Sequence, residues 1–227
     1  MDPLTFDLAR TPLREVNAAL HTPGLSGDFL VENPAGAHNL AVGLTCSVNV
    51  TIRGHVGYYA AGMNQRASVV IEGNAGTGVA ENMMSGTVVV RGNASQSAGA
   101  TAHGGLLVVE GDAAARCGIS MKGADIVVGG NVGHGSAFMA QAGRLVVRGD
   151  AGDGLGDSIY EARLYVRGSV ASLGADCVAK EMRAEHVEEL AGLLKAAGFE
   201  GDDPAGYTRY GSARGLYHFQ AANSASY

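Results

Sequence analysis

Seven glycines recur at a fixed interval of 19 residues through the middle of the chain, and this period restricts the fold more than any other feature of the sequence. The seven are Gly54, Gly73, Gly92, Gly111, Gly130, Gly149 and Gly168. Each ends a short run of β-branched and aliphatic residues, such as Val88 to Arg91. A fixed period of this length is typical of repeat proteins, in which each unit stacks on the next.

Hydrophobic alternation within each run predicts strands. The residues four and two positions before the glycine are apolar in all seven repeats, as with Val50 and Ile52 before Gly54. A period of two places both side chains on one buried face of a strand. Nineteen residues are too few for a strand, a helix and two loops, so we expect two or three short strands per coil. The sequence therefore predicts an all-β fold, a right-handed parallel β-helix of about seven 19-residue coils.

Two further columns of the repeat support parallel stacking. The residue before the glycine alternates in charge over four repeats, as Arg53, Glu72, Arg91 and Glu110, which places opposite charges side by side. The position three residues after the glycine holds only Gly, Ser or Ala, which indicates a tight corner. We expect the seven glycines either to adopt positive φ or to let the next coil approach closely.

The regular repeats divide the chain into three parts. Residues 1–40 are predicted as an N-terminal cap segment, with a short helix from Thr11 to Leu20. Residues 41–180 form the β-helix, in which residues 41–49 are a degenerate first coil. Residues 181–227 follow as a C-terminal helix and an aromatic tail. Capping segments are expected because a terminal coil would otherwise expose unpaired backbone groups.

The C-terminal part combines a helical pattern with an aromatic segment. From Glu181 to Gly198 the apolar residues recur on one face, acidic residues come early, Lys195 comes late, and Gly198 is a typical stop. The segment that follows carries five aromatic residues, Tyr207, Tyr210, Tyr217, Phe219 and Tyr227. It either packs along the solenoid or docks a partner, and the sequence leaves both alternatives open.

Composition and charge exclude several classes of partner. The chain has 16 basic and 22 acidic residues, a formal net charge of −6, and no basic stripe for nucleic acid or an anionic membrane. No apolar run approaches the roughly 20 residues of a membrane span. The N-terminus lacks the basic and apolar regions of a signal peptide, so we expect a cytoplasmic protein. The widely separated Cys46, Cys117 and Cys177 are predicted to be buried free thiols.

We expect no catalytic, cofactor-binding or metal-binding residue in this chain. The histidines of the repeats share no column, and Gly152, Gly154 and Gly156 do not complete a dinucleotide-binding motif. One acidic group leaves two alternatives, a cation or acid–base site and a solvated, salt-bridged face, of which the second is preferred because arginines flank it. The acidic residues are Asp150, Asp153, Asp157 and Glu161, and the arginines are Arg144, Arg148, Arg163 and Arg167.

Methionines occupy a limited set of repeat positions. They are Met63, Met83, Met84, Met121 and Met139. Such flexible side chains either line an adaptable partner surface or fill the core, and core filling is the simpler interpretation.

The repeated phrase resembles a known domain. Val90-Arg-Gly-Asn-Ala-Ser95 and Val147-Arg-Gly-Asp-Ala-Gly152 are two examples that resemble the GXGXG β-helix domain. That domain forms the C-terminal part of the glutamate synthase large subunit and also occurs in one of the subunits of formylmethanofuran dehydrogenase. The resemblance covers about residues 40–180 and implies a structural domain rather than a reaction centre.

A free-standing chain of this length is similar to the small subunit of N-methylglutamate synthase, through Gly62-Met-Asn64 and the ending Gly215-Leu-Tyr-His-Phe219. The resemblance implies a hetero-oligomer with an amidotransferase-like subunit and a subunit that carries FMN and an iron–sulfur cluster. It implies the reaction of methylamine with L-glutamate to give N-methylglutamate and ammonia. It assigns this chain a non-catalytic role, without a cofactor of its own, in holding the partners in register.

Two other functions are alternatives. The first is the GXGXG-containing subunit of a formylmethanofuran dehydrogenase or a formyltransferase/hydrolase complex, although those chains tend to be longer. The second is an independent β-helix enzyme of the polysaccharide-lyase or acyltransferase kind, which would need a carboxylate or histidine cluster in a groove. In the synthase interpretation, the choice of amine donor lies with the partner subunits.

Overall fold

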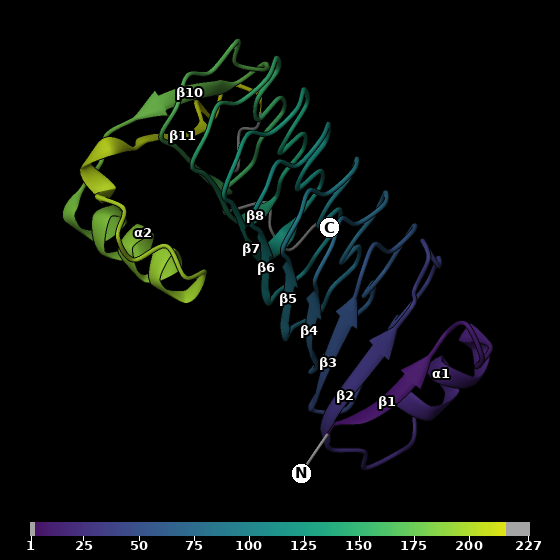
Figure 1. Ribbon diagram of the computed structural model, residues 1–227. Coiled ribbons are helices and arrows are strands. Elements are labelled where there is room, and N and C mark those ends of the chain that lie inside the picture. The colour runs from purple at the N-terminus through teal and green to yellow at the C-terminus, as the bar shows by residue number, and fades with distance from the viewer. Residues whose placement is uncertain (1–2, 217–227) are drawn as a thin grey trace, which may run out of the picture.

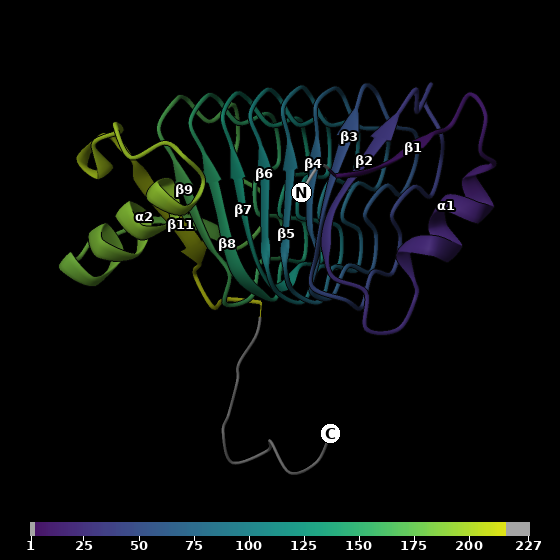
Figure 2. The same ribbon diagram turned by 60° about the horizontal axis from the view of Figure 1, so that its bottom comes forward.

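The computed structural model describes residues 3–216, which form a parallel β-solenoid of about seven turns with two α-helices (Figure 1). This confirms the all-β parallel solenoid predicted from the 19-residue period. A single 11-stranded sheet runs along the molecule in the order β1-β2-β3-β4-β5-β6-β7-β8-β9-β11-β10. Helices α1 and α2 lie at opposite ends of that sheet (Figure 2).

The strands of the solenoid are short, with four to seven residues each. They are β1 (Leu4–Asp7), β2 (Gly27–Glu32), β3 (Val48–Arg53), β4 (Ser68–Ile71), β5 (Thr87–Val90), β6 (Leu106–Val109), β7 (Lys122–Val128), β8 (Ala142–Val147) and β9 (Arg163–Val166). From β3 to β9 the parallel register follows the glycine period, with Val50 opposite Val69 and Val69 opposite Val88. The sheet also extends into the first 40 residues, where Leu4 pairs with Phe29 and Phe29 with Val50.

The alternating residues of these strands form the core, as predicted. Val50 and Ile52 are 1% and 0% exposed, and their equivalents in the other coils are as completely buried. The rest of each coil differs from the prediction of two or three strands. It contains one or two isolated bridges, such as Ala75 opposite Ala94, and otherwise turns.

The turns replace further strands through an alternating left-handed backbone. In one coil, Tyr59, Ala61 and Met63 have φ of 60°, 53° and 54°, and the pattern recurs in the coils that follow. The N–H of Ala61 donates to O of Leu40 in the preceding coil, whereas the N–H of Met63 donates to O of Glu81 in the next. A non-glycine residue in this region costs roughly 1–2 kcal/mol, and these hydrogen bonds between coils offset that cost.

The glycine column is explained by a ladder of side chains. The backbone N–H of Asp112 donates to Oδ1 of Asn93 at 2.8 Å, and the N–H of Asn131 donates to Oδ1 of Asp112 at 2.7 Å. A Cβ at Gly111 would overlap Oδ1 of Asn93, and a Cβ at Gly130 would overlap Oδ1 of Asp112. The seven glycines were expected either to adopt positive φ or to let the neighbouring coil approach closely. Gly54 has φ of +130°, and the other six are sites of close approach.

Helix α1 (Leu13–Leu20) closes the N-terminal end of the core, and begins two residues later than predicted because Pro12 precedes it. Its residues Val16 and Leu20 are fully buried. Asn17 donates from Nδ2 to O of Asn39 at 2.9 Å and accepts from the N–H of Ala41 at 3.0 Å. The side-chain amide of Asn17 thus makes two backbone hydrogen bonds that a preceding coil would make inside the solenoid.

The C-terminal end is closed by a strand that returns antiparallel. Strand β11 (Thr208–Ser212) inserts between β9 and β10 (Cys177–Lys180), with Tyr210 opposite Leu164. It follows helix α2 (Ala184–Ala196) and the 3₁₀ turn η1 (Pro204–Gly206). The edge of β9 is therefore paired, which removes a site for edge-to-edge association.

Helix α2 is shorter than the predicted Glu181 to Gly198 and covers the outer face of the sheet. Its N-cap is Arg183, whose backbone N–H donates to Nδ1 of His186 at 3.2 Å. Leu190 and Leu194 of α2 are buried in one cluster with Val127, Val146 and Tyr165 of β7, β8 and β9. Neither α1 nor α2 combines the length and the apolar character that a membrane span requires.

Candidate functional site

The acidic group singled out in the sequence is not brought together. Oδ1 of Asp150 accepts from the backbone N–H of Ser169 at 2.7 Å, as one rung of the ladder, and these hydrogen bonds lower the pKa of Asp150. Asp153 accepts from Oγ of Ser172, and Asp157 from Oγ of Ser158. Glu161 pairs with Arg214 at 2.8 Å. Each carboxylate thus has its own partner, and those partners are not the four flanking arginines.

Those arginines pair instead with two carboxylates from the C-terminal part. Asp202 binds Arg148 through both oxygens, at 2.7 and 2.8 Å, and also contacts Nη1 of Arg167 at 3.1 Å. The Tyr207 hydroxyl donates to the same carboxylate at 2.7 Å. The Arg148 guanidinium also lies 4.1 Å from the ring centroid of Phe199, a cation–π contact. These hydrogen bonds, led by that from Arg148, lower the pKa of Asp202 to about 2.

A second carboxylate joins another pair of stacked arginines. Arg144 and Arg163 are register partners in β8 and β9, and Glu189 of α2 pairs with both of them. The Tyr165 hydroxyl donates to Oε1 of Glu189 at 2.6 Å. Like charges opposite each other in a sheet repel, so Glu189 and Asp202 stabilise the solenoid while they hold the C-terminal segment on it.

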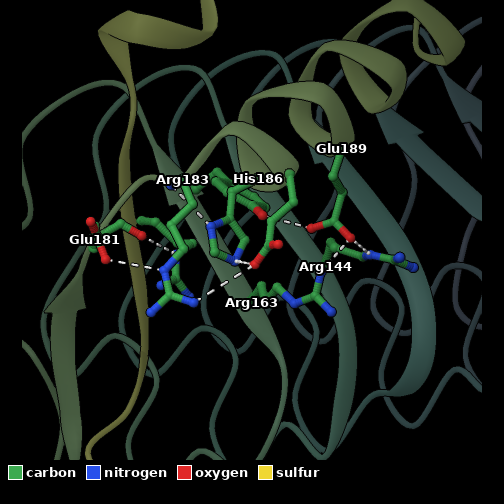
Figure 3. A network of polar contacts seen from close by, with 9 residues as sticks. Arg144, Arg163, Glu181, Arg183, His186 and Glu189 are labelled. Carbon is green, nitrogen blue, oxygen red and sulfur yellow. Dashed lines mark hydrogen bonds and ion pairs between the residues drawn. The ribbon is translucent and has the colours of Figure 1, made fainter.

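A polar cavity of about 380 Å³ lies between the end of the solenoid and the start of α2. Its lining is strongly basic, with Arg163, Lys180, Arg183, Arg209 and Arg214, and its only acidic lining residue within residues 3–216 is Glu161. Figure 3 shows Arg183 and His186 at the start of α2, next to the Glu189 network with Arg144 and Arg163. We call this space the basic cavity.

His186 belongs to this cavity and is 7% exposed. Its Nδ1 accepts the N–H of Arg183, and its Nε2 lies 3.6 Å from Glu185. Burial, followed by the positive charge of Arg209, lowers the pKa of His186. Burial and the neighbouring positive charge thus both favour the neutral form of the imidazole.

The other histidines and cysteines of the described residues are dispersed along the solenoid and its ends. Across residues 3–216, no group of three or more His, Cys, Asp or Glu side chains is placed to hold a metal ion. His38 and His55 each accept a backbone N–H through Nδ1. Cys117 and Cys177 are buried free thiols, as predicted, and burial raises their pKa to about 12 and about 11. Cys46 is only partly buried.

The methionines divide between the two interpretations. Met83 and Met121 are fully buried in the core, whereas Met63, Met84 and Met139 are 51%, 48% and 36% exposed. Met63 and Tyr59 line a shallow hollow of about 160 Å³ on the turn side of the solenoid. We call Tyr58, Tyr59, Met63, Met84 and Met139, all exposed, the turn-side apolar residues.

Of the two segments that carried the resemblance, Gly62-Met-Asn64 has a local structural role, and Gly215-Leu-Tyr-His-Phe219 lies partly outside the described residues. In Gly62-Met-Asn64, the Asn64 side chain is fully buried and donates to O of Ala67 at 2.8 Å. In the aromatic segment, Tyr207 is buried and Tyr210 is part of β11, so this portion packs on the solenoid. Tyr217, Phe219 and Tyr227 lie outside the described residues.

Sequence reasoning missed the basic cavity because its residues come from β9, β10, β11 and α2, which no repeat relates. It also missed the cover on the outer face of the sheet. Val127, Val146 and Tyr165 sit between the alternating core positions, and apolar residues at every position of a strand indicate that both faces are covered.

The chain is similar to a protein of known sequence over almost its entire length. No family model matches it. Protein GlxC of Rhizobium meliloti (strain 1021) is 59% identical over 225 residues, which are 98% of this chain and 99% of that protein. The match spans both caps as well as the repeats. The chain therefore belongs to the same family as Protein GlxC.

Proposed function

We propose that this chain is the non-catalytic β-solenoid subunit of a glutamate-synthase-like complex, an N-methylglutamate synthase. The proposal takes its partners from the resemblance in the repeats, an amidotransferase-like subunit and a subunit with FMN and an iron–sulfur cluster. The observation that carries it is the uninterrupted solenoid with exposed turn-side apolar residues. The identity to Protein GlxC, which extends over almost the full length of both sequences, supports a shared role for this fold.

A stiff solenoid suits this role for a physical reason. An amine that passes between two sites must not be lost to bulk water, which requires the subunits that hold those sites to stay at a fixed separation. The ladder from Asn74 to Ser169 and the parallel sheet join every coil to the next. Close packing of this kind transmits force with little deformation, so the solenoid would act as a spacer between partners.

The turn-side apolar residues are the surface we assign to a partner. Exposed aromatic and methionine side chains are enriched at protein–protein interfaces. Met63 and Tyr59 line the 160 Å³ hollow, and Met84 is a further half-exposed methionine. Burial of these side chains would be favourable in a complex, at about 25 cal/mol per Å² of apolar area.

Native mass spectrometry of the chain purified gently from its own cell tests the function. Co-purification with an amidotransferase-like chain and a chain that carries FMN and an iron–sulfur cluster would support the synthase. Partners of the molybdopterin or formyltransferase kind would replace it with the formyl-transfer alternative. A homo-oligomer alone would overturn both.

Paired variants test the surface. Met63→Glu and Met84→Glu are expected to reduce co-purification of a partner without unfolding the solenoid, since both side chains are about half exposed. Lys195→Gln makes the same change in net charge from an exposed position on α2 and serves as the control. Normal assembly of both methionine variants would show that this face does not bind a partner.

A further inference from the structure

We propose that the basic cavity binds a small oxyanion, a phosphate or carboxylate group, between Lys180 and Arg209. The inference concerns a ligand site and is independent of the assembly role proposed above. It follows from a comparison of three pairs of neighbouring cations at this end of the solenoid, two of which are bridged by a carboxylate.

Three pairs of cations lie side by side near the C-terminal end. Arg144 and Arg163 are opposite each other in β8 and β9, and Glu189 pairs with both. Arg148 and Arg167 are one repeat apart, and Asp202 pairs with both. In these two pairs, a carboxylate of the chain itself neutralises the repulsion.

The third pair has no such carboxylate. Lys180 of β10 and Arg209 of β11 are directly opposite in the antiparallel register, so their side chains share one face of the sheet. Within residues 3–216, neither is paired with an acidic side chain, and the guanidinium of Arg209 has only a backbone contact, from Nε to O of Glu181. Like charges directly opposite each other destabilise a sheet.

The other cations of the cavity are already neutralised. Arg163 pairs with Glu189, Arg183 with Glu181, and Arg214 with Glu161. Residues 217–227 contain no Asp or Glu that could reach the remaining pair. The uncompensated charge of the cavity is therefore that of Lys180 and Arg209.

The size and chemistry of the space fit a small oxyanion. A volume of about 380 Å³ is within the range of small-molecule sites. Arg209 offers a planar fork of donors and Lys180 a compact ammonium, which together suit phosphate or carboxylate oxygens. The pKa of His186 is lowered mainly by burial and further by the charges of Arg209 and Arg163, and this second contribution agrees with an electropositive cavity.

Calorimetric titration of the full chain tests the site, with sodium phosphate and with glutarate as probes and sodium chloride at equal ionic strength as the reference. We expect one of the two probes to bind saturably, with a Kd of about 1 mM or tighter. Binding of phosphate alone assigns a phosphate group, and binding of glutarate alone assigns a carboxylate. Absence of saturation by both up to about 10 mM overturns the proposal.

Variants locate the binding. Lys180→Gln and Arg209→Gln are each expected to weaken binding about tenfold or more, the loss typical of one charged hydrogen bond. Arg66→Gln removes the same charge from an exposed position several coils away and is expected to bind as the wild type does. Equal affinity in Lys180→Gln and the wild type would overturn the assignment.

A stability measurement separates binding from folding. Without ligand, Lys180→Gln is expected to melt at the same temperature as the wild type or higher, because one of two repelling charges is gone. At the same ligand concentration, the wild type is expected to gain more stability than Lys180→Gln, because its affinity is higher. If a variant does not fold, NMR titration of the wild type replaces it. Chemical-shift changes at the backbone amides of Lys180 and Arg209 would support the proposal, and changes confined to other parts of the chain would overturn it.

Discussion

Oδ1 of Asn93 accepts the backbone N–H of Asp112 at 2.8 Å, and the same oxygen occupies the space beside Gly111. The ladder and the glycine column are therefore two parts of one arrangement. The polar side chain of one coil crosses to the backbone of the next, and the next coil must have no Cβ at that point. This relationship makes the central glycines sensitive to the smallest substitution.

Gly111→Ala is expected to lower the free energy of unfolding by about 2–3 kcal/mol, as for an overpacked core. The new Cβ would overlap Oδ1 of Asn93 and lie 2.9 Å from O of Gly92. Gly111→Val should go further and prevent assembly with partners. Urea unfolding measures the first effect and co-purification the second.

Gly192→Ala is the matched control for this substitution. Gly192 lies in α2 with open space around it, so alanine should stabilise the helix by about 0.5–1 kcal/mol. A Gly111→Ala protein as stable as the wild type would show that the coils adjust without cost.

Asp202→Asn is expected to destabilise the folded protein by about 3 kcal/mol or more, because Arg148 and Arg167 would lose the carboxylate between them. The Asp202 side chain is 9% exposed, so solvent compensates little. Thermal unfolding measures the loss. Glu200→Gln, at an exposed neighbouring position, should have almost no effect on thermal unfolding. An equal loss of stability in that variant would contradict a specific role for the Asp202 carboxylate.

The pH dependence of stability provides a separate test of Asp202. Its pKa falls from 3.8 to about 2 in the folded protein, so the ionised carboxylate stabilises the fold above about pH 4. This contribution, about 2 kcal/mol, is lost as the pH falls toward 2. Unfolding free energies of the wild type and of Asp202→Asn should therefore converge between pH 4 and pH 2, and a constant difference would contradict the assignment.

Asn17→Ala should destabilise the N-terminal end by about 1–3 kcal/mol, since the N–H of Ala41 and the carbonyl of Asn39 each lose a partner. Hydrogen exchange at the Ala41 amide should become faster while exchange in β5 and β6 stays slow. Arg14→Ala, on the exposed side of α1, is the control. Unchanged exchange at Ala41 would mean that the end of the first coil is protected by another group.

A thiol reagent at pH 8 should label one cysteine of the native protein quickly and all three only after unfolding. Burial raises the pKa of Cys117 to about 12 and of Cys177 to about 11, whereas Cys46 is partly exposed. Thiolate is the reactive form. Cys46→Ser should remove the rapid phase, and a second rapid thiol in that variant would show that the core opens.

The sheet and its core could be predicted from sequence because each coil repeats the same packing. Val50 and Ile52 occupy the same buried positions of their coil as Val69 and Ile71 do in the next. The 19-residue spacing between equivalent residues therefore predicts which residues are opposite each other in the sheet. The left-handed turns carry no comparable signal, since Ala61 has φ of 53° although alanine ordinarily favours a right-handed helix. There the tertiary hydrogen bonds override local preference.

The helix of the C-terminal part was predicted, but the contacts that attach this part to the solenoid were beyond sequence reasoning for a different reason. Glu189 and Asp202 reach arginines 26 to 54 residues earlier in the chain, and β11 pairs with β9 across the whole of α2. Such non-local contacts leave no period to detect. The basic cavity depends on these same connections, because Lys180 and Arg209 are neighbours only through the antiparallel pairing of β10 with β11.

The ladder of Asn and Asp side chains also limits the changes of length that this fold would tolerate. Every internal coil presents the same acceptor to one neighbour and the same donor to the other, so removal of one unit rejoins matching surfaces. The molecule can therefore grow or shrink only in whole steps of about 4.8 Å. Helix α1 closes one end and strand β11 closes the other, and neither is part of the repeat. A change of length by whole coils would therefore leave both caps unchanged.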